Sequence, residues 1–84
     1  MENSTEKREL TLGEKRVRTE FNPSQTGTVN YLKQKSADLI NVCEDLKPKE
    51  DEEVLNLSEK LRLIALAQTG YEEAAMWAVK AATA

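Results

Sequence analysis

Histidine is absent from the sequence, so the side chain that most often serves as a general base or a metal ligand is missing. The single cysteine, Cys43, cannot form an internal disulfide, and without a histidine it is a poor candidate for a nucleophile. The Gly-Lys-Ser/Thr sequence that a phosphate-binding P-loop requires is also absent. We therefore expect a protein that is not an enzyme and that has no catalytic residue, no metal site and no cofactor.

Turn-forming residues, aromatic residues and long apolar runs are also scarce. Three glycines, two prolines and four aromatic side chains occur in 84 residues, whereas Ala, Leu, Glu and Lys, which favour helix, dominate. No apolar run approaches the ~20 residues of a membrane span, and no apolar segment of a signal peptide follows the polar N-terminus. We expect one small all-α domain that is soluble and cytoplasmic and has no membrane partner.

Charge is unevenly distributed along the chain, whose net charge is −3. Residues 1–36 contain seven basic and five acidic side chains, and residues 37–84 contain five basic and ten acidic ones. A protein that binds duplex DNA usually has a dominant basic face, which this distribution does not provide. The locally basic first half suits a small anion better than DNA, although a solvated charged surface would give the same composition.

Two segments have the apolar spacing of paired helices. The first runs from about residue 28, with Thr28 as its N-cap, to residue 47, before Pro48. Its seam positions repeat at heptad spacing: Val29, Leu32, Ser36, Leu39, Cys43 and Leu46. The second helix begins near the acidic run 49–53, which the helix dipole favours. Its seam positions are Val54, Leu57, Leu61 and Ile64. The matching seams predict an antiparallel helical hairpin.

A short third helix is predicted at residues 71–83. Thr69 and Glu72 have the spacing of a capping box, and Gly70 between them indicates a break.

The last third of the chain, residues 61–84, is apolar on more faces than so small a protein can bury alone. Between residues 74 and 84, only Lys80 is charged. Further leucines lie off the hairpin seam: Leu55, Leu63 and Leu66. We therefore expect a homo-oligomer in which this surface packs on other copies.

The N-terminal part of the chain is charged and weakly patterned. We expect residues 1–10 to be mobile. Thr11 and Glu14 have capping-box spacing, after which only a short turn of helix could follow. We divide the chain into a partly flexible N-terminal segment, residues 1–20, and a helical hairpin domain, residues 21–84.

One group of residues has the chemistry of a nucleotide-binding site. Phe21 offers a ring for base stacking, and Asn22, held next to Pro23, can bond to a base edge or a ribose hydroxyl. Lys33 or Lys35 on the following helix offers a point charge for phosphate.

Arg62 is a second candidate, because it lies in an apolar stretch where a guanidinium needs an acidic partner, water or an anionic ligand. The structural alternative makes Phe21 a staple that closes the hairpin and makes Arg62 one half of an ion pair. Its partner would then be a carboxylate such as Glu59 or Glu72. The residue types alone favour this alternative.

Five stretches are informative together, because of their order and spacing. They are RTEFNPS at 18–24, Val29 with Leu32-Lys33, ADLI at 37–40, RLIALAQT at 62–69 and AAMWAVKA at 74–81. From about residue 16 to residue 83, the sequence resembles the small phage anti-CBASS cyclic-oligonucleotide sponge family. Proteins of this family are helical hairpins that assemble into hexamers and sequester cyclic oligonucleotide second messengers without cleaving them. The resemblance implies a phage protein that acts in the host cytoplasm and prevents activation of immune effectors.

The resemblance also implies two classes of pocket. One, between protomers, binds cyclic dinucleotides such as cyclic GMP-AMP, and in this chain it corresponds to Phe21, Asn22, Pro23, Lys33 and Lys35. The other, near a three-fold contact, binds cyclic trinucleotides and corresponds to Arg62, Thr69 and Asn22. Part of the family has tyrosine where this chain has Phe21, so a phenol hydrogen bond is missing here whereas stacking is retained. The alternative function is that of a structural helical oligomer or adaptor that binds a protein partner.

Overall fold

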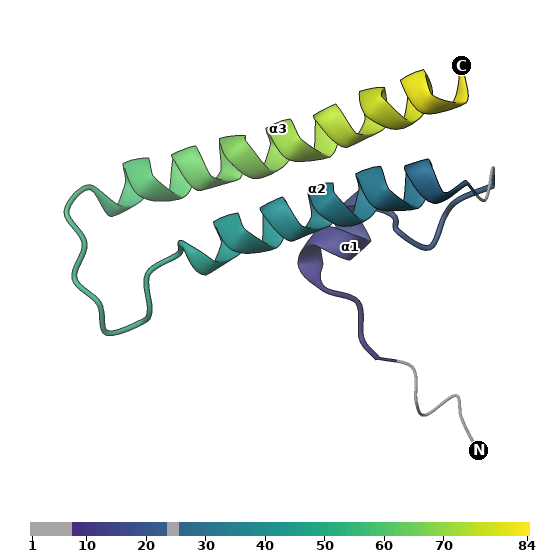
Figure 1. Ribbon diagram of the computed structural model, residues 1–84. Helices are drawn as coiled ribbons and strands as arrows, with labels where there is room; N and C mark the ends of the chain where they lie inside the picture. Colours follow the sequence, from purple (N-terminus) through teal and green to yellow (C-terminus); the bar gives the residue numbers. More distant parts are fainter. Residues whose placement is uncertain (1–7, 24–25) are drawn as a thin grey trace.

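The computed structural model describes residues 8–23 and 26–84, and these residues form three helices and no strand. The helices are α1, Leu12–Val17, α2, Gly27–Asp45, and α3, Leu57–Thr83. α2 and α3 lie side by side and antiparallel, and the short α1 packs against α2 (Figure 1). The expected all-α fold with a helical hairpin is therefore confirmed for the described residues.

α1 begins with the capping box that its sequence predicts. The Thr11 hydroxyl accepts a hydrogen bond from the Glu14 N–H at 3.2 Å, and the Glu14 carboxylate accepts one from the Thr11 N–H at 2.9 Å. Both bonds satisfy donors that have no partner inside the helix. Residues 1–7 lie outside the described part of the chain, and with them most of the segment that we expected to be mobile.

The N-cap of α2 lies two residues earlier than predicted, at Thr26 rather than Thr28, and the helix begins at Gly27. The Thr26 hydroxyl accepts a hydrogen bond from the Val29 N–H at 3.3 Å. The helix ends at Asp45, two residues before the predicted end and ahead of Pro48.

The buried face of α2 differs in part from the predicted heptad seam. Val29 and Cys43 are buried as predicted, but Leu39 and Leu46 are 44% and 53% exposed. α2 contacts α1 as well as α3, so its buried face is set by two neighbours instead of one partner helix. The residues on that face are Val29, Lys33, Ala37, Ile40 and Cys43.

The connection between α2 and α3 covers residues 46–56, so the predicted helix start at the acidic run 49–53 is wrong. The Glu52 carboxylate accepts a hydrogen bond from the Lys49 N–H at 2.8 Å, which closes a local turn that competes with helix. Asn56, with a left-handed φ of 57°, directly precedes α3.

α3 is one continuous helix, so the predicted break at Gly70 and the separate helix 71–83 are wrong. The Glu72 carboxylate accepts a bond from Arg16 of α1 at 2.8 Å, and this contact explains its position better than a cap does. A glycine inside a helix costs about 1 kcal/mol relative to alanine, which the strong helix formers around Gly70 offset. The short helix that accompanies the hairpin is instead α1, which precedes the hairpin in the sequence.

The three helices share a small apolar core. Ile64 of α3 is buried as predicted, but Leu57 and Leu61 from the same predicted repeat are 46% and 38% exposed. The central cluster takes one residue from α1, two from α2 and one from α3: Val17, Ala37, Ile40 and Ala75. This cluster fixes α1 against the hairpin, which determines where the chain after α1 lies.

Candidate functional site

The turn that follows α1 places Phe21 beside α2. Arg18 has a left-handed φ of 59°, and its carbonyl accepts a hydrogen bond from the Phe21 N–H at 2.9 Å. This bond closes the turn, and Phe21 itself remains 59% exposed. An exposed aromatic ring on a hydrogen-bonded turn is a surface on which a base can stack.

Lys33 of α2 joins the two ends of this turn. Its ammonium donates to the carbonyl of Arg18 at 2.9 Å and to the carbonyl of Phe21, and it lies 5.3 Å from the centroid of the Phe21 ring. Lys33 is only 7% exposed. Burial, and to a lesser degree the nearby charge of Arg18, lowers the pKa of Lys33 from its ordinary value. The structure thus brings together the predicted residues Phe21 and Lys33.

Asn22 and Pro23 lie between this turn and the start of α2. The Asn22 amide donates to the Asn30 side-chain oxygen at 2.8 Å and to the Thr26 carbonyl at 3.2 Å. Pro23 is exposed. Asn22 is therefore anchored to the first turns of α2, next to the aromatic residue with which it was predicted to act.

Lys35 belongs to a different part of the α2 surface. Its ammonium lies 5.5 Å from the centroid of the Tyr31 ring, and both residues are exposed. The structure therefore separates the two lysines that the sequence left as alternatives: Lys33 contacts Phe21, and Lys35 contacts Tyr31.

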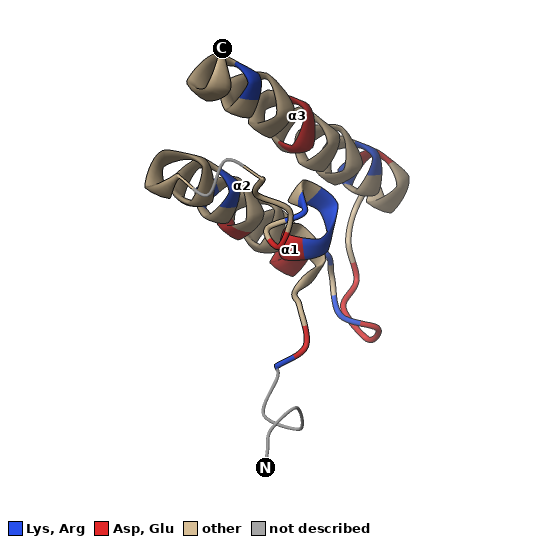
Figure 2. Cartoon of the chain, turned by 90° about the vertical axis from the view of Figure 1, so that its right-hand side faces the viewer, with Lys and Arg blue, Asp and Glu red and all other residues tan. Residues whose placement is uncertain are grey.

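A groove of about 660 Å³ lies beside Lys33, where the end of α1 and the turn after it face α3. Arg16 and Glu72 form an ion pair at 2.8 Å in its lining. The charged lining residues come from all three helices and from the turn, and Figure 2 shows basic residues on each of the helices. They are Arg16, Arg18, Lys33, Lys80, Glu72 and Glu73. Its apolar lining residues are Val17, Ala75, Met76 and Val79. An excess of basic groups around apolar side chains suits an anionic ligand with aromatic parts.

Three basic residues of this groove were not assigned to a site from the sequence. Arg16 and Arg18 belong to the locally basic first half of the chain, and Lys80 is isolated in an apolar stretch near the C-terminus. No sequence spacing links the first two to the third, because only the packing of α1 against the hairpin brings them together.

Arg62 lies outside this groove. Its guanidinium donates to the Glu59 carboxylate at 3.0 and 2.8 Å, and the two side chains are 59% and 52% exposed. This bond raises the pKa of Arg62 and lowers that of Glu59. Thr69 lines the groove beside Lys33, so the single chain does not bring Arg62, Thr69 and Asn22 together. Glu59 is one of the two carboxylates that we considered as structural partners.

A second groove, of about 420 Å³, lies near the connection between α2 and α3. Its lining is mainly apolar and includes Cys43, Leu46, Leu55, Leu63 and Ile64. Cys43 is 8% exposed, which confirms its expected place in the buried face of the hairpin.

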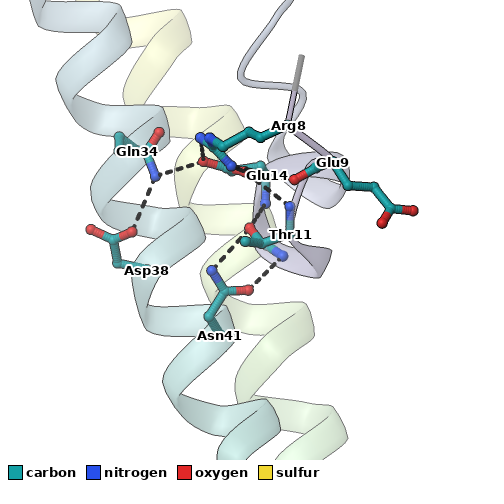
Figure 3. Close-up of polar contacts among 8 residues, drawn as sticks. Arg8, Glu9, Thr11, Glu14, Gln34, Asp38 and Asn41 are labelled. Atoms are coloured by element: carbon teal, nitrogen blue, oxygen red, sulfur yellow. Dashed lines mark hydrogen bonds and ion pairs between the residues drawn. The ribbon is translucent and has the colours of Figure 1, made fainter. Parts of the chain in front are cut away.

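A polar cluster holds α1 and the preceding segment to α2 (Figure 3). The Glu14 carboxylate accepts two bonds from the Arg8 guanidinium, at 2.8 and 2.7 Å, and one from the Gln34 amide at 3.2 Å. Asn41 accepts from the Gly13 N–H at 2.8 Å and donates to the Thr11 hydroxyl at 3.0 Å. Because α1 leads directly into the Arg18–Phe21 turn, this cluster also helps to position the candidate site.

Within residues 8–23 and 26–84, no group of three or more His, Cys, Asp or Glu side chains is arranged to hold a metal ion. In the same described part of the chain, none of the helices combines the length and the apolar content needed to cross a membrane.

A comparison with protein families matches the chain to a family model. The model of the Acb2/Tad1 hairpin domain matches residues 14–83, which include α2, α3, most of α1 and the turn that carries Phe21. Comparisons with curated proteins and with solved structures found no match. Because the model covers far more than half of the sequence, the chain belongs to the Acb2/Tad1 hairpin family, the anti-CBASS sponge family.

Proposed function

We propose that the protein binds cyclic dinucleotide and cyclic trinucleotide second messengers and withholds them from host immune effectors without cleaving them. Family membership implies the general role of an anti-CBASS cyclic-nucleotide sponge. One observation on this chain carries the proposal: the exposed ring of Phe21 is fixed on a turn that Lys33 joins to α2, beside a groove rich in basic side chains.

The proposed site for cyclic dinucleotides such as cyclic GMP-AMP consists of Phe21, Asn22, Pro23 and Lys33, with Lys35 as the alternative lysine. The Phe21 ring stacks on a base, which contributes roughly 1–3 kcal/mol per base. Support comes from its exposure and from the contacts that hold its backbone in place.

The proposed site for cyclic trinucleotides consists of Arg62, Thr69 and Asn22, contributed by different protomers near a three-fold contact. Three converging guanidinium groups repel one another, and a ligand with three phosphates relieves that repulsion with matching symmetry. The Arg62–Glu59 pair is more than half exposed, so solvent weakens it and Arg62 can exchange its carboxylate partner for phosphate.

The protein is proposed to assemble into a homohexamer. It would be encoded by a phage and would act in the host cytoplasm. Its mechanism is mass action: each bound messenger is withheld from an effector, so the protein must be abundant and must bind tightly. No turnover is needed, in keeping with a sequence that lacks histidine.

Calorimetry with cyclic GMP-AMP and with a cyclic trinucleotide tests the proposal. We expect tight binding of both, and we expect heat-denatured complexes to release the ligands chemically intact. Phe21→Ala should weaken cyclic GMP-AMP binding about ten- to a hundredfold, whereas Tyr31→Ala, at an exposed aromatic position on α2, should bind like the wild-type protein. Linear products that form at a protein-dependent rate would contradict sequestration.

Arg62→Ala separates the two proposed sites. We expect it to abolish binding of the cyclic trinucleotide and to spare cyclic GMP-AMP. A joint loss of both ligands with a smaller particle would instead assign Arg62 to a structural ion pair. If the wild-type protein binds neither ligand, the alternative of a structural oligomer or adaptor for a protein partner is favoured.

A further inference from the structure

The ammonium of Lys33 is already engaged in the ligand-free protein. Of its three N–H donors, one bonds to the carbonyl of Arg18 and another to the carbonyl of Phe21. The residue is 7% exposed, whereas Phe21, which it holds, is 59% exposed. A phosphate that took Lys33 as its main contact would compete with two backbone carbonyls for the same ammonium, and losing those bonds would cost stability.

The turn that Lys33 holds needs such support. Arg18 adopts a left-handed conformation, which non-glycine residues avoid unless their surroundings stabilise it. The Phe21 N–H closes the turn on the Arg18 carbonyl, and the Lys33 ammonium bonds to that same carbonyl. Lys33 therefore acts on both ends of the segment that presents the ring.

Arg18 offers the more accessible positive charge. It is exposed, it lies on the same turn as Phe21, and it lines the same groove as Lys33. A guanidinium binds phosphate through two parallel hydrogen bonds, a geometry that an ammonium cannot provide.

We infer that Lys33 is a positioning residue that fixes the Arg18–Phe21 turn through its two carbonyl bonds, and that Arg18 supplies the cation that binds the ligand phosphate. This inference rests on the proposed function for its ligand, an anionic cyclic dinucleotide. It assigns the conformational and the electrostatic tasks of one site to two different side chains.

Amide hydrogen exchange of the ligand-free protein tests the role of Lys33 without any ligand. Lys33→Met keeps a stem of similar length and removes the donors. We expect the Phe21 amide to exchange at least about tenfold faster in this variant, while amides in the middle of α2 and α3 keep their wild-type rates. Lys49→Met, which removes an exposed lysine from the connection between α2 and α3, should change neither.

Affinity for cyclic GMP-AMP over a series of salt concentrations tests the role of Arg18. We expect Arg18→Met to weaken binding and to reduce its dependence on salt, because screening acts on the contact between Arg18 and phosphate. Lys33→Met should also weaken binding, but with a salt dependence close to that of the wild type. A wild-type exchange rate at Phe21 in Lys33→Met, together with a flattened salt dependence in that variant, would overturn the inference.

If Lys33→Met does not fold, a structure of the wild-type protein with cyclic GMP-AMP decides instead. We expect the ammonium to remain on both carbonyls and the Arg18 guanidinium to lie on a phosphate. Transfer of the ammonium from the carbonyls to phosphate contradicts the inference. Absence of cyclic GMP-AMP binding by the wild-type protein rejects the proposed function and the role of Arg18. Where Lys33→Met folds, its exchange experiment decides the role of Lys33 independently of any ligand.

Discussion

Glu14 links three parts of the chain through one buried carboxylate. Its side chain is 4% exposed, and its bonds reach Arg8 before α1, Thr11 at the helix cap and Gln34 on α2. The bond from Arg8, and next the Thr11 N–H, holds the pKa of Glu14 well below its usual range. The carboxylate is therefore bound more strongly in its charged form in the folded protein than in the unfolded chain.

Glu14→Gln should lower the free energy of unfolding by roughly 1–3 kcal/mol at neutral pH. Glutamine keeps the capping-box geometry at this position but loses the charge that pairs with Arg8. Urea denaturation followed by circular dichroism measures the difference. Glu9→Gln, which neutralises an exposed carboxylate nearby, is the matched control and should have little effect.

The difference in stability between the wild type and Glu14→Gln should also depend on pH. Because the folded pKa of Glu14 lies below the ordinary value of 4.5, its contribution to stability is fully present above that value and is lost as pH falls below it. The difference in stability between the wild type and Glu14→Gln should therefore shrink toward low pH. A difference that stays constant from about pH 6 to about pH 3 would show that the charge of Glu14 does not stabilise the fold.

At the residue scale, the structure brings together Phe21 and Lys33, which the sequence had grouped, but the bonds of Lys33 to two backbone carbonyls were not predicted. Aromatic, amide and lysine side chains near residues 21–35 indicated nucleotide chemistry, but Lys33 and Lys35 could not be distinguished. The choice depends on where the chain returns after α1, which the left-handed conformation of Arg18 determines. Such a conformation at an arginine has no signal in the residue type.

At the scale of elements, α1 approaches α2 through a glycine. A Cβ at Gly13 would lie 2.0 Å from the Ala37 carbonyl oxygen and 2.7 Å from its carbonyl carbon, and these backbone atoms cannot move without shifting α2. Gly13→Ala should therefore cost about 1–3 kcal/mol or displace α1. Thermal denaturation measures the loss, and faster exchange of the Phe21 amide would report that the turn after α1 moves with it.

Gly70→Ala is the opposite case. Nothing lies within 4 Å of a Cβ at Gly70, and the residue is inside α3. Alanine should therefore raise the free energy of unfolding by about 0.5–1 kcal/mol, since it costs less backbone entropy in a helix. A loss of stability in thermal denaturation would indicate that the assembled protein bends, or packs tightly, at this position.

Gly70 also shows why helix boundaries were harder to predict than helices. The capping-box spacing of Thr69 and Glu72 matches a helix start, and the same spacing occurs by chance inside a helix. The capping box of Thr11 and Glu14 did mark a true start. The two cases differ in the hydrogen bond that the glutamate makes. Glu14 bonds to its own N-cap, whereas Glu72 makes a tertiary contact with Arg16 on another helix.

At the scale of the whole molecule, a single chain leaves many of its large apolar side chains exposed. The Cα trace spans 45 × 39 × 12 Å, so the molecule is a thin layer with few interior positions. Large apolar side chains on the hairpin are about half exposed, among them Leu63, Leu66, Met76 and Trp77 at 51%, 55%, 50% and 56%. Exposure of this many large apolar side chains on one helix is typical of an interface between subunits.

Light scattering should therefore give a mass several times that of the 9.5 kDa chain, and six times under the proposed hexamer. Leu66→Glu should lower this mass, because it places a charge in the apolar surface, whereas Ser58→Glu adds the same charge at an exposed polar position of α3 and should leave the mass unchanged. A monomeric wild-type protein would contradict the assembly.

If the dinucleotide pocket lies between protomers, Leu66→Glu should also lose cyclic GMP-AMP binding in proportion to its loss of mass, although the Arg18–Phe21 turn is unaltered. Binding that survives in a Leu66→Glu monomer would instead place the whole site within one chain, on the groove beside Lys33.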